Sequence, residues 1–561
     1  MATTKWDVVV VTAMDEDQKQ GFQKQLTSLT SNGCIPSSCQ YRVYRDWPPG
    51  FKIGGGGATL VALNELYAEY GDALFDHRIL LIHSGGYSQR QPTASVTGKL
   101  FAPLPRPSRG TGCCTVLELK MQCYEPLLER MRPGIFLAAS DALESFHLEP
   151  SDHWNFHLDG FTVLAHPSPL DVGRNHGVYV LDESALSVKE SCFMSGCSRV
   201  LQKPSVEQMR SAGAVRKRPG SDEEFVYTDS AFFFSSSVIR LLLDFYKAEQ
   251  PLSWGELDTY GDFLQPLGPQ AMAEYVHDLS RVVGVEAEKA DGLRAQRLRL
   301  YHALRHCPIQ AMVLPLSKFY HLGTLPELLN CCTVDTEFQE RFQTQQITHS
   351  LFTIRSPLDG KTKMNIPANV QGCLMSSRIH PDSCLPRSTI VEFSNLEQPI
   401  QLSENSCISN CYCHTPFSIS ISVVMTTIPV KEHGPSSSLT KYATVVLGTF
   451  DDVKRKSTSA ELTYLGGPLA QRCMQTEEQT ASLWTTKLFR LMDTPEDAFQ
   501  AALALINARD SVVEPGSLAS ISDILLQKDI DHLLTMRQNL SSNILLQFNA
   551  SRSNGSGSNL N

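Results

Sequence analysis

The feature that most constrains the fold is a repeated alternation in the first 340 residues. Short apolar runs rich in β-branched residues alternate with longer segments of mixed polarity, a pattern typical of an α/β domain with a largely parallel sheet. The runs occupy residues 6–13, 78–83, 134–139, 161–165, 177–181 and 311–314. Ligands bind at the carboxyl ends of strands in such sheets. The residues that follow the runs are therefore the first candidates for a site: Gly85, Gly86, Ser140, Asp141, His166 and Pro167.

The chain has 561 residues, enough for three or four domains. After residue 340 the sequence changes to short apolar segments separated by Ser, Cys, Asn and Pro, and from about residue 470 a helical pattern returns. We therefore predict an α/β domain over residues 1–340, a β-rich domain over 341–470 and a helical segment over 471–548. Residues 549–561 are Ser, Asn and Gly with almost nothing to bury, which predicts a disordered tail.

Aliphatic residues recur at intervals of six within the β-rich region, at Ile390, Leu396, Leu402 and Ile408. This is the period of hexapeptide repeats, so the region is predicted to form a β-helix, of the left-handed type, which often serves as an assembly surface. The alternative is a β-sandwich with a chance alignment. Farther along, Ser520-x-x-Asp523 has the pattern of a capping box at the start of a helix.

The charge and cysteine content exclude several classes of protein. Lys and Arg number 49 against 59 Asp and Glu, a net charge of −10, which argues against binding to nucleic acid or to an anionic membrane. There is no signal-peptide core and no apolar stretch of about 18 residues, so we expect a soluble, cytoplasmic protein. The 16 cysteines are scattered, as expected of reduced thiols. A zinc site at Cys411-x-Cys413-His414 is the less favoured alternative, since a second cysteine pair is missing.

Two glycine-rich segments are candidates for nucleotide binding. The first, Gly54, Gly55, Gly56 and Gly57, precedes an apparent helix, where backbone N–H groups can approach an anion or a base edge. It matches neither the P-loop nor the dinucleotide-binding spacing. A glycine loop without a ligand is an equally good interpretation.

The second glycine segment lies in a strongly basic stretch. Between Asp76 and Glu118 there is no acidic residue, while five cations occur: Arg78, Arg90, Lys99, Arg106 and Arg109. These cations are spaced among Gly, Pro and Ser, beside Gly85 and Gly86. Such a stretch in an acidic chain is suited to attract phosphate groups, although a solvated basic loop is the simpler alternative.

Several motifs now combine into a resemblance. Gly85-Gly86-x-x-x-Arg90-x-Pro92 with Lys99 downstream resembles the signature loop of sugar nucleotidyltransferases, although the usual glycine before its Thr-Arg pair is missing. Further segments follow in the order of that superfamily: Asp141 after a strand, Gln202-Lys203-Pro204, and Phe319-Tyr320-His321-Leu322-Gly323-Thr324. The amino-acid sequence of almost the whole chain, from about Trp6 to Leu540, is most similar to the family of GDP-L-fucose pyrophosphorylases. The resemblance implies a Rossmann-like nucleotidyltransferase domain at the N-terminus.

The resemblance also implies a reaction and a set of site residues. The family forms GDP-L-fucose and diphosphate from GTP and β-L-fucose 1-phosphate, with Mg²⁺. Carried over to this chain, Arg90 and Lys99 would bind the triphosphate and Lys203 the sugar phosphate. Asn175 and His176 are assigned to sugar hydroxyls. Asp141 would hold Mg²⁺, with Asp262, or less favourably Asp258, as a second metal carboxylate; either of the latter two could instead be a solvated acid on a helix.

Two other functions are compatible with the sequence. An L-fucose kinase would need a further domain with a glycine-serine phosphate loop, and the segment of that kind, residues 434–438, is followed by too little chain. A scaffold that binds a nucleotide sugar without making it would have no need of Lys99 and Asp141. The guanine contact is left open between a backbone carbonyl near residues 54–57 and a carboxylate.

Overall fold

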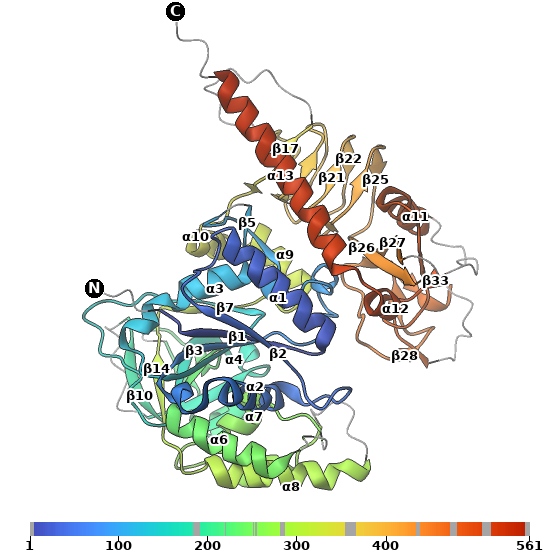
Figure 1. Cartoon of the computed structure of the whole chain (residues 1–561). Helices are drawn as coiled ribbons and strands as arrows, with labels where there is room; N and C mark the ends of the chain where they lie inside the picture. Colours follow the sequence, from blue (N-terminus) through green and yellow to red (C-terminus); the bar gives the residue numbers. More distant parts are fainter. Residues whose placement is uncertain are drawn as a thin grey trace, which may run out of the picture. The chain divides into compact units, whose positions relative to one another are not determined.

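The chain folds into two units, described in turn below (Figure 1). The first comprises residues 1–86 and 119–321, and the second comprises residues 87–118 and 322–561. The computed structural model describes residues 5–110, 112–182, 191–218, 220–250, 252, 255–280, 287–353, 366–433, 438–471, 480–507 and 518–555. Residues 87–118, which the sequence analysis assigned to the domain over 1–340, thus belong to the second unit.

An eleven-stranded mixed sheet forms the centre of the first unit, in the order β11-β12-β9-β10-β14-β8-β13-β6-β3-β1-β2. Strands β2, β1, β3 and β6 are parallel neighbours, as are β8 and β14, while the other pairs are antiparallel. The strands of this unit, with the separate pair β7 and β15, are β1 Val8–Ala13, β2 Gln40–Arg45, β3 Arg78–His83, β6 Gly134–Ala139, β7 Ala142–Ser145, β8 Phe161–Pro169, β9 Gly177–Leu181, β10 Phe193–Gln202, β11 Arg216–Lys217, β12 Glu224–Thr228, β13 Phe232–Ser235, β14 Ile309–Val313 and β15 Lys318–His321.

The six predicted strands are all present, but two details of the prediction were wrong. The sheet is not largely parallel, because β13 enters antiparallel between β6 and β8 and β10 runs antiparallel to β14. Strand β8 also continues to Pro169, so His166 lies inside the strand instead of after it. Its buried ring contacts Ser317 Oγ and Ser230 Oγ at 2.7 Å each, which removes it from the candidate ligand contacts.

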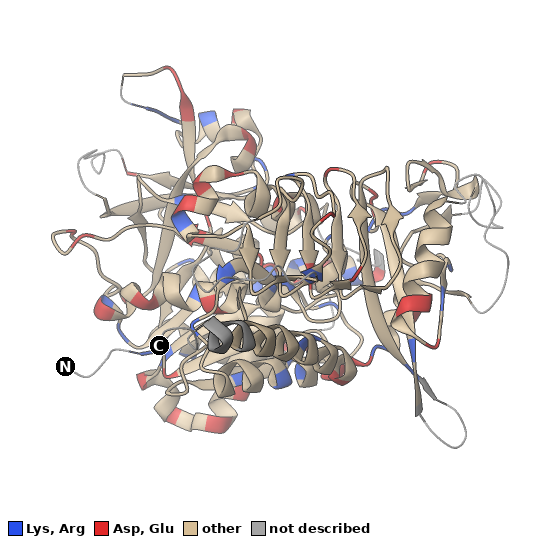
Figure 2. Cartoon of the chain, turned by 90° about the horizontal axis from the view of Figure 1, so that it is seen from above, with Lys and Arg blue, Asp and Glu red and all other residues tan. Residues whose placement is uncertain are grey.

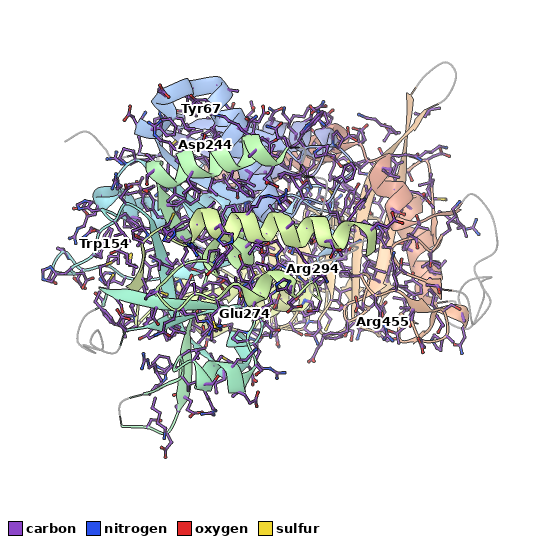
Figure 3. The ribbon with its side chains drawn as sticks, turned by 90° about the horizontal axis from the view of Figure 1, so that it is seen from below. Tyr67, Trp154, Asp244, Glu274, Arg294 and Arg455 are labelled. Carbon is purple, nitrogen blue, oxygen red and sulfur yellow. The ribbon has the colours of Figure 1, made fainter. Side chains whose placement is uncertain are left out.

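Helices cover both faces of this sheet. In Figure 1, α1 lies on one face and α2, α6 and α8 on the other. Figure 3 views the unit from the side of α6 and α8, whose exposed surfaces carry Asp244 and Arg294. The helices are α1 Glu16–Ser31, α2 Gly54–Tyr70, α4 Leu170–Gly173, α5 Val206–Ser211, α6 Ser236–Glu249, α7 Thr259–Leu264 and α8 Ala287–Leu304, with α3 Val116–Tyr124 crossing the boundary between the units.

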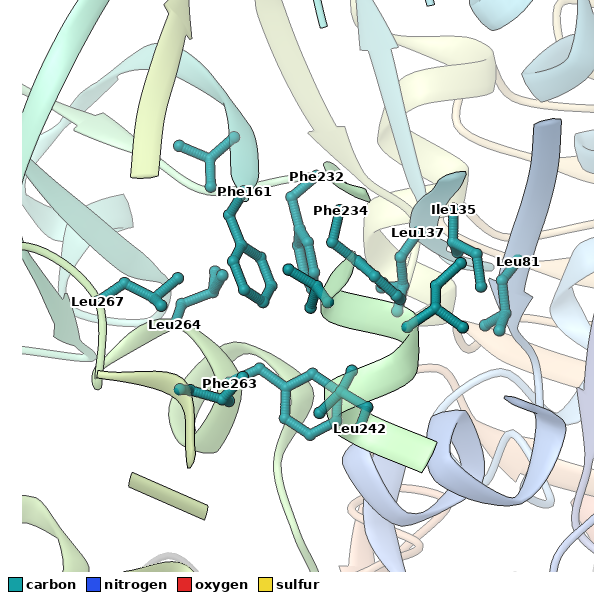
Figure 4. Packing of buried hydrophobic residues seen from close by; sticks show 14 of the residues in the cluster. Leu81, Ile135, Leu137, Phe161, Phe232, Phe234, Leu242, Phe263, Leu264 and Leu267 are labelled. Atoms are coloured by element: carbon teal, nitrogen blue, oxygen red, sulfur yellow. The ribbon is translucent and has the colours of Figure 1, made fainter. Parts of the chain in front are cut away.

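The core of the first unit lies between the sheet and these helices. Phe161, Phe232 and Phe234 of β8 and β13 pack side by side, with Leu242 of α6 and Phe263 of α7 beneath them (Figure 4). All five are buried. Burying large apolar side chains on the α6 and α7 side holds the strands in place and leaves their carboxyl ends to carry polar residues.

The second unit is dominated by short parallel strands stacked into three sheets, in the orders β16-β18-β20-β23-β26-β27, β17-β19-β21-β24 and β22-β25. All pairs are parallel except the closing hairpin of β26 and β27. These strands are β16 Ile347–Thr348, β17 Leu351–Phe352, β18 Cys373–Met375, β19 Arg378–Ile379, β20 Ile390–Glu392, β21 Asn395–Leu396, β22 Ile400–Gln401, β23 Cys407–Ser409, β24 Tyr412–Cys413, β25 Phe417–Ser418, β26 Val423–His433 and β27 Ser438–Gly448.

The repeat in this stack differs from the predicted one. One row of the ladder pairs Cys373, Ile390, Cys407 and Val424, so each coil takes 17 residues. The six-residue period placed Ile390 and Ile408 in register. In the ladder, however, Ile408 pairs with Val391, so the two isoleucines are one position out of register. All four aliphatic residues of the predicted period are nevertheless buried.

Serine side chains explain the polar composition of the coils. Ser377 Oγ accepts a hydrogen bond from Ser394 N at 3.1 Å, and Ser394 Oγ accepts one from Cys411 N at 3.0 Å. Each buried hydroxyl thus satisfies the backbone of the next coil. The stacked strands carry few charged side chains (Figure 2).

The remaining elements of the second unit pack around the coils. They are β4 Pro103–Pro107, β5 Cys113–Thr115, α9 Leu325–Thr333, α10 Thr336–Phe342, β28 Ser457–Thr458, β29 Thr463–Tyr464, β30 Gly467–Pro468, β31 Thr480–Ala481, β32 Phe489–Arg490, α11 Pro495–Asn507, β33 Leu518–Ala519, α12 Ile521–Leu526 and α13 Ile530–Gly555. The predicted capping box of Ser520 and Asp523 is confirmed at the start of α12. Helix α13 includes residues 549–555, where a disordered tail was predicted; residues 556–561 lie outside the described residues.

Buried charges anchor α13 on the coils. Arg537 donates from Nε to Asn410 Oδ1 at 2.8 Å, lies over the ring of Phe393 and neutralises the buried Glu392 electrostatically. Cys411 and Cys413 are buried thiols that contact backbone carbonyls, while His414 lies 2.9 Å from Glu397. Residues 434–437, from the segment considered for a kinase loop, lie outside the described residues.

Within the described ranges, no helix has both the length and the apolar character needed to cross a membrane.

Candidate active site

The carboxyl ends of β1 and β3 are joined by a residue that the sequence analysis did not single out. Gln18 of α1 accepts hydrogen bonds at Oε1 from Met14 N at 2.8 Å and Gly86 N at 3.3 Å, and donates from Nε2 to Gly86 O at 2.9 Å. Gly86 has φ +118°, a conformation that favours glycine. The buried amide therefore holds the Gly85-Gly86 turn against the loop that follows β1.

The first glycine segment forms the initial turn of α2, not a loop before it. Gly56 N donates to Leu257 O at 2.8 Å, and Leu257 N donates to Ile53 O at 2.9 Å. A Cβ at Gly54, where φ is +71°, would lie 2.4 Å from Leu257 O. Close approach of the Leu257 backbone is thus sufficient to require glycine here, and the nucleotide-binding role of Gly54, Gly55, Gly56 and Gly57 stays a prediction.

The basic part of the signature segment belongs to the second unit. Arg90 is exposed, and its carbonyl accepts a hydrogen bond from Leu325 N at 2.9 Å. Lys99 begins a short 3₁₀ helix, Lys99–Phe101, directly after Gly98 with φ +82°. The glycines of the signature and its two cations therefore fall on opposite sides of the boundary at Gly86.

Asp141 lies in the turn between β6 and β7, beside a histidine. Strand β7 pairs with β15 so that Ala142 is opposite His321, and His321 Nε2 comes within 3.8 Å of Asp141 Oδ2. The Asp141 side chain is about a quarter exposed. It is therefore accessible to a ligand, as a metal-binding carboxylate must be.

A buried ion pair restrains this turn. Lys120 donates from Nζ to the carbonyl of Ala142 and to Tyr124 Oη at 3.0 Å, and lies 3.6 Å from Glu144 Oε2. Tyr124 Oη donates in turn to Glu144 Oε2, and all three side chains are fully buried. Because the bonded carbonyl follows Asp141 directly, the ion pair restrains the backbone that carries Asp141.

The structure brings together two of the predicted sugar-phosphate residues and adds a third. Lys203 N donates to His176 O at 3.0 Å, so the two residues are held side by side. Asp229 follows β12 and places Oδ1 3.8 Å from His176 Nδ1, with a side chain only 6% exposed. Next to Lys203, Gln202 donates from Nε2 to Asp258 Oδ2 at 3.0 Å. The imidazole of His176 also packs edge-on against Phe319, with ring centroids 5.0 Å apart.

The electrostatics of this region centre on Asp229. Burial, opposed by a backbone hydrogen bond from Gly177 and by the charge of Lys203 and assisted by the charge of Asp258, raises the pKa of the Asp229 carboxyl to about 7. The pKa of Tyr260 is also raised, by burial and by the charges of Asp229 and Asp141, which places these groups in one electrostatic neighbourhood. Perturbed groups gathered at one end of a sheet are typical of functional sites.

Two of the predicted site residues, Asn175 and Asp262, make hydrogen bonds to other parts of the protein. Asn175 is exposed and donates from its side-chain amide to Asp171 O at 3.2 Å, within its own turn. Asp262 is buried, accepting from Arg297 Nε at 2.6 Å and from Asp258 N at 2.7 Å. Oδ1 of Asp262 bonds α7 to α8 and Oδ2 accepts from the N-cap residue of α7, so Asp262 has a structural role here, while the metal role predicted for it stays a prediction.

Only weak sequence signals point to the residues that were missed. Asp229 follows a strand, as Asp141 does, but that strand was not among the predicted runs. His321 stood within a recognised segment without a role of its own. Within the described part of the chain, no cluster of three or more His, Cys, Asp or Glu side chains is arranged to bind a metal. A metal here would thus depend on phosphate oxygens for its other ligands.

Comparison with known proteins identifies the family. The fucose pyrophosphorylase domain model matches residues 71–509. The chain is 34% identical to the human fucose-1-phosphate guanylyltransferase, over 97% of this chain and 91% of that protein. This chain belongs to the fucose pyrophosphorylase family.

Two more distant matches are partial. The Arabidopsis thaliana bifunctional fucokinase/GDP-fucose pyrophosphorylase is 29% identical over 37% of this chain and 22% of its own length. A crystal structure of a UDP-glucose pyrophosphorylase complexed with UDP-glucose matches 58% of this chain and 96% of that chain at 10% identity, with a TM-score of 0.24.

Proposed function

We propose that this chain transfers the guanylyl group of GTP to β-L-fucose 1-phosphate, forming GDP-L-fucose and diphosphate. The observation that carries this proposal is the identity to a fucose-1-phosphate guanylyltransferase over almost the whole of both chains. The arrangement of Asp141, His176 and Lys203 at one end of the sheet of a mixed α/β unit supports it. We also propose that this unit is a Rossmann-like nucleotidyltransferase domain.

The chemistry makes modest demands on the protein. The attacking group is a phosphate oxygen that already carries charge at neutral pH, so a Ser-His-Asp or Cys-His arrangement is not required. The protein must align two polyanions and stabilise the charge that passes to the departing diphosphate. Lysine and arginine side chains are suited to this task.

Cations from two parts of the sequence would share this work. Lys203 is held beside His176 by its backbone, in the left-handed conformation with φ +48°, and we assign it to the phosphate of the sugar. Arg90 and Lys99 are assigned to the triphosphate on the strength of the signature segment alone. The Gly85-Gly86 turn, held by Gln18, would let the nucleotide approach the backbone closely, because glycine has no side chain in the way.

A divalent cation fits the donor set at Asp141. Mg²⁺ in nucleotide enzymes is commonly held by one or two carboxylates together with phosphate oxygens, and Asp141 is accessible and restrained by the Lys120 ion pair. When bound, the ion would neutralise phosphate charge. We propose Asp141 as its protein ligand and GTP and fucose 1-phosphate as the source of the others.

Two finer features of the chain belong to the same proposal. We infer that the stacked coils form a left-handed β-helix, supported by three parallel sheets and the 17-residue repeat. We also propose that the enzyme works in the cytoplasm, a compartment that keeps the described cysteines as free thiols.

Product analysis tests the reaction. Purified protein is incubated with GTP, Mg²⁺ and fucose 1-phosphate, and in parallel with ATP, Mg²⁺ and free fucose. We expect diphosphate and GDP-fucose in the first reaction and no ADP above background in the second. ADP formed from ATP and fucose would favour a kinase, and binding of GDP-fucose without turnover in either reaction would favour a scaffold.

A further inference from the structure

A buried carboxylate behind the sugar-phosphate residues has no part in the reaction as described so far. Asp229 follows strand β12, and its backbone N–H donates to Gly177 O at 2.9 Å. A Cβ on Gly177 would lie 2.3 Å from Asp229 Oδ2. Any side chain at position 177 would therefore displace the carboxylate. Asp229 can occupy its position because residue 177 is a glycine.

The carboxylate faces an imidazole that is itself restrained. Asp229 Oδ1 lies 3.8 Å from His176 Nδ1, and Phe319 packs edge-on against the same ring. The backbone of His176 is bonded to Lys203 N. The ring and the carboxylate thus lie close together, and a backbone hydrogen bond holds Lys203 beside His176; the three residues come from separate segments of the first unit.

A carboxylate behind an imidazole nitrogen determines what the ring can do. It favours the tautomer with the proton on Nδ1, so that Nε2 accepts a hydrogen bond. Histidine ligands and catalytic histidines are commonly oriented in this way. An arrangement at 3.8 Å would tighten when a ligand orders the ring, as active-site contacts often do.

We propose that Asp229 is a positioning residue that holds His176 to accept a hydrogen bond from one ring hydroxyl of the acceptor sugar. This inference rests on the proposed function and adds the residue that makes the enzyme selective for a sugar 1-phosphate carrying that hydroxyl. Lys203 binds the phosphate, and the His176–Asp229 pair recognises a hydroxyl of the sugar next to it. A site built around a hydroxyl discriminates strongly against an analogue that lacks it.

A carboxylate buried at this position lowers the stability of the folded chain. Burial raises the pKa of Asp229 to about 7, which means that its charged form is destabilised in the folded chain. An asparagine would fill the same volume without that cost. Groups that destabilise the fold are commonly retained where function needs them.

Steady-state kinetics with deoxy analogues tests the proposal. Asp229→Asn, His176→Ala and the double variant are assayed with fucose 1-phosphate and with its 2-, 3- and 4-deoxy analogues. We expect Asp229→Asn to raise KM for fucose 1-phosphate about tenfold and to change KM for GTP by less than about twofold. The double variant should be no worse than His176→Ala. Asp222→Asn, at a fully exposed position, is the matched control.

The analogues separate positioning from a structural role. With wild type, one analogue should lose at least about tenfold in kcat/KM, and on that analogue wild type and Asp229→Asn should be equal within about twofold. A loss of equal size on every substrate, or effects of the two variants that simply multiply, would overturn the inference. If Asp229→Asn does not fold, His176→Gln at the half-buried ring provides the same comparison. Failure of wild type to form GDP-fucose would instead contradict the proposed function itself.

Discussion

Both units of the chain bury polar side chains, but they satisfy them differently. In the second unit, Ser377, Ser394 and Cys411 form a ladder in which each hydroxyl bonds the backbone of the next coil. In the first unit, Asp141 and His176 lie at the ends of strands with part of their surface open to solvent. Polar groups that satisfy one another stabilise the fold, whereas partly exposed ones are available to a ligand.

This contrast also distinguishes two kinds of buried charge. Asp262 and Arg297 are paired within hydrogen-bonding distance and hold two helices together. Asp229 has a histidine nearby at 3.8 Å, and burial raises the pKa of both carboxyls. Burial by itself therefore does not distinguish the paired carboxylate of Asp262 from that of Asp229, for which a role in the reaction is proposed; the geometry of the partner does.

The largest expected effect is on stability, at the structural ion pair. Replacing Asp262 by Asn leaves the Arg297 guanidinium buried without its counter-charge. We expect the free energy of unfolding of the first unit to fall by about 3–5 kcal/mol, measured by urea denaturation. Asp222→Asn, on the surface, should change it by less than about 0.5 kcal/mol. An unchanged free energy of unfolding in Asp262→Asn would contradict a structural role for the Asp262–Arg297 ion pair.

A second effect, of opposite sign, is expected at Asp46. Burial and the nearby Asp15 raise the pKa of Asp46 from 3.8 to about 7, so the folded chain holds a proton that the unfolded chain has lost. Stability from this group is therefore complete below about pH 4 and is lost as pH rises to about 7. Asp46→Asn should gain about 2–4 kcal/mol at pH 8 and nothing at pH 4, by denaturation at both values. An equal gain at both pH values would contradict this origin.

Asp141→Asn tests the functional side of the comparison. We expect turnover to fall by about 10², equivalent to about 2.7 kcal/mol, with an unchanged melting temperature and little change in GDP-fucose binding. Lys99→Met, in the second unit, is the partner experiment. A comparable loss of turnover there would support the role assigned to Lys99, and wild-type turnover in both variants would remove the roles assigned to them.

The smallest effect is expected in the serine ladder. Ser394→Ala leaves the buried N–H of Cys411 without its acceptor, so the second unit should lose about 1–2 kcal/mol while turnover stays at the wild-type value. Denaturation and the guanylyltransferase assay measure the two quantities on the same sample. A clear loss of turnover without loss of stability would mean that the coils take part in the reaction.

The prediction from sequence was most successful where a pattern is local. The run at residues 134–139 became β6 with the same bounds, and the capping pattern at Ser520 and Asp523 starts α12 as expected. The parallel character of the sheet was overestimated, because strand direction depends on how the connections cross and not on the apolar pattern of any one strand. The six-residue period found the buried residues of the coils but not the true repeat of 17, which the ladder register reveals.

The site was predicted in part, for a related reason. Asp141 and Lys203 could be named because motifs of a known family surround them. Gln18, Asp229 and Lys120 could not, because each acts on a partner far away in the sequence: Gln18 on Gly86, Asp229 on His176, and Lys120 on the backbone after Asp141.

The amino-acid sequence alone thus determined the family, six strands of the α/β unit and the change to a serine-rich coil, since composition, apolar period and motifs are properties of neighbouring residues. The tertiary structure decided that Asp262 is an ion-pair partner, that Gly54 makes room for Leu257, and that Asp229 stands behind His176. Those outcomes depend on which distant segments meet, and the chain brings these segments together only when its core packs.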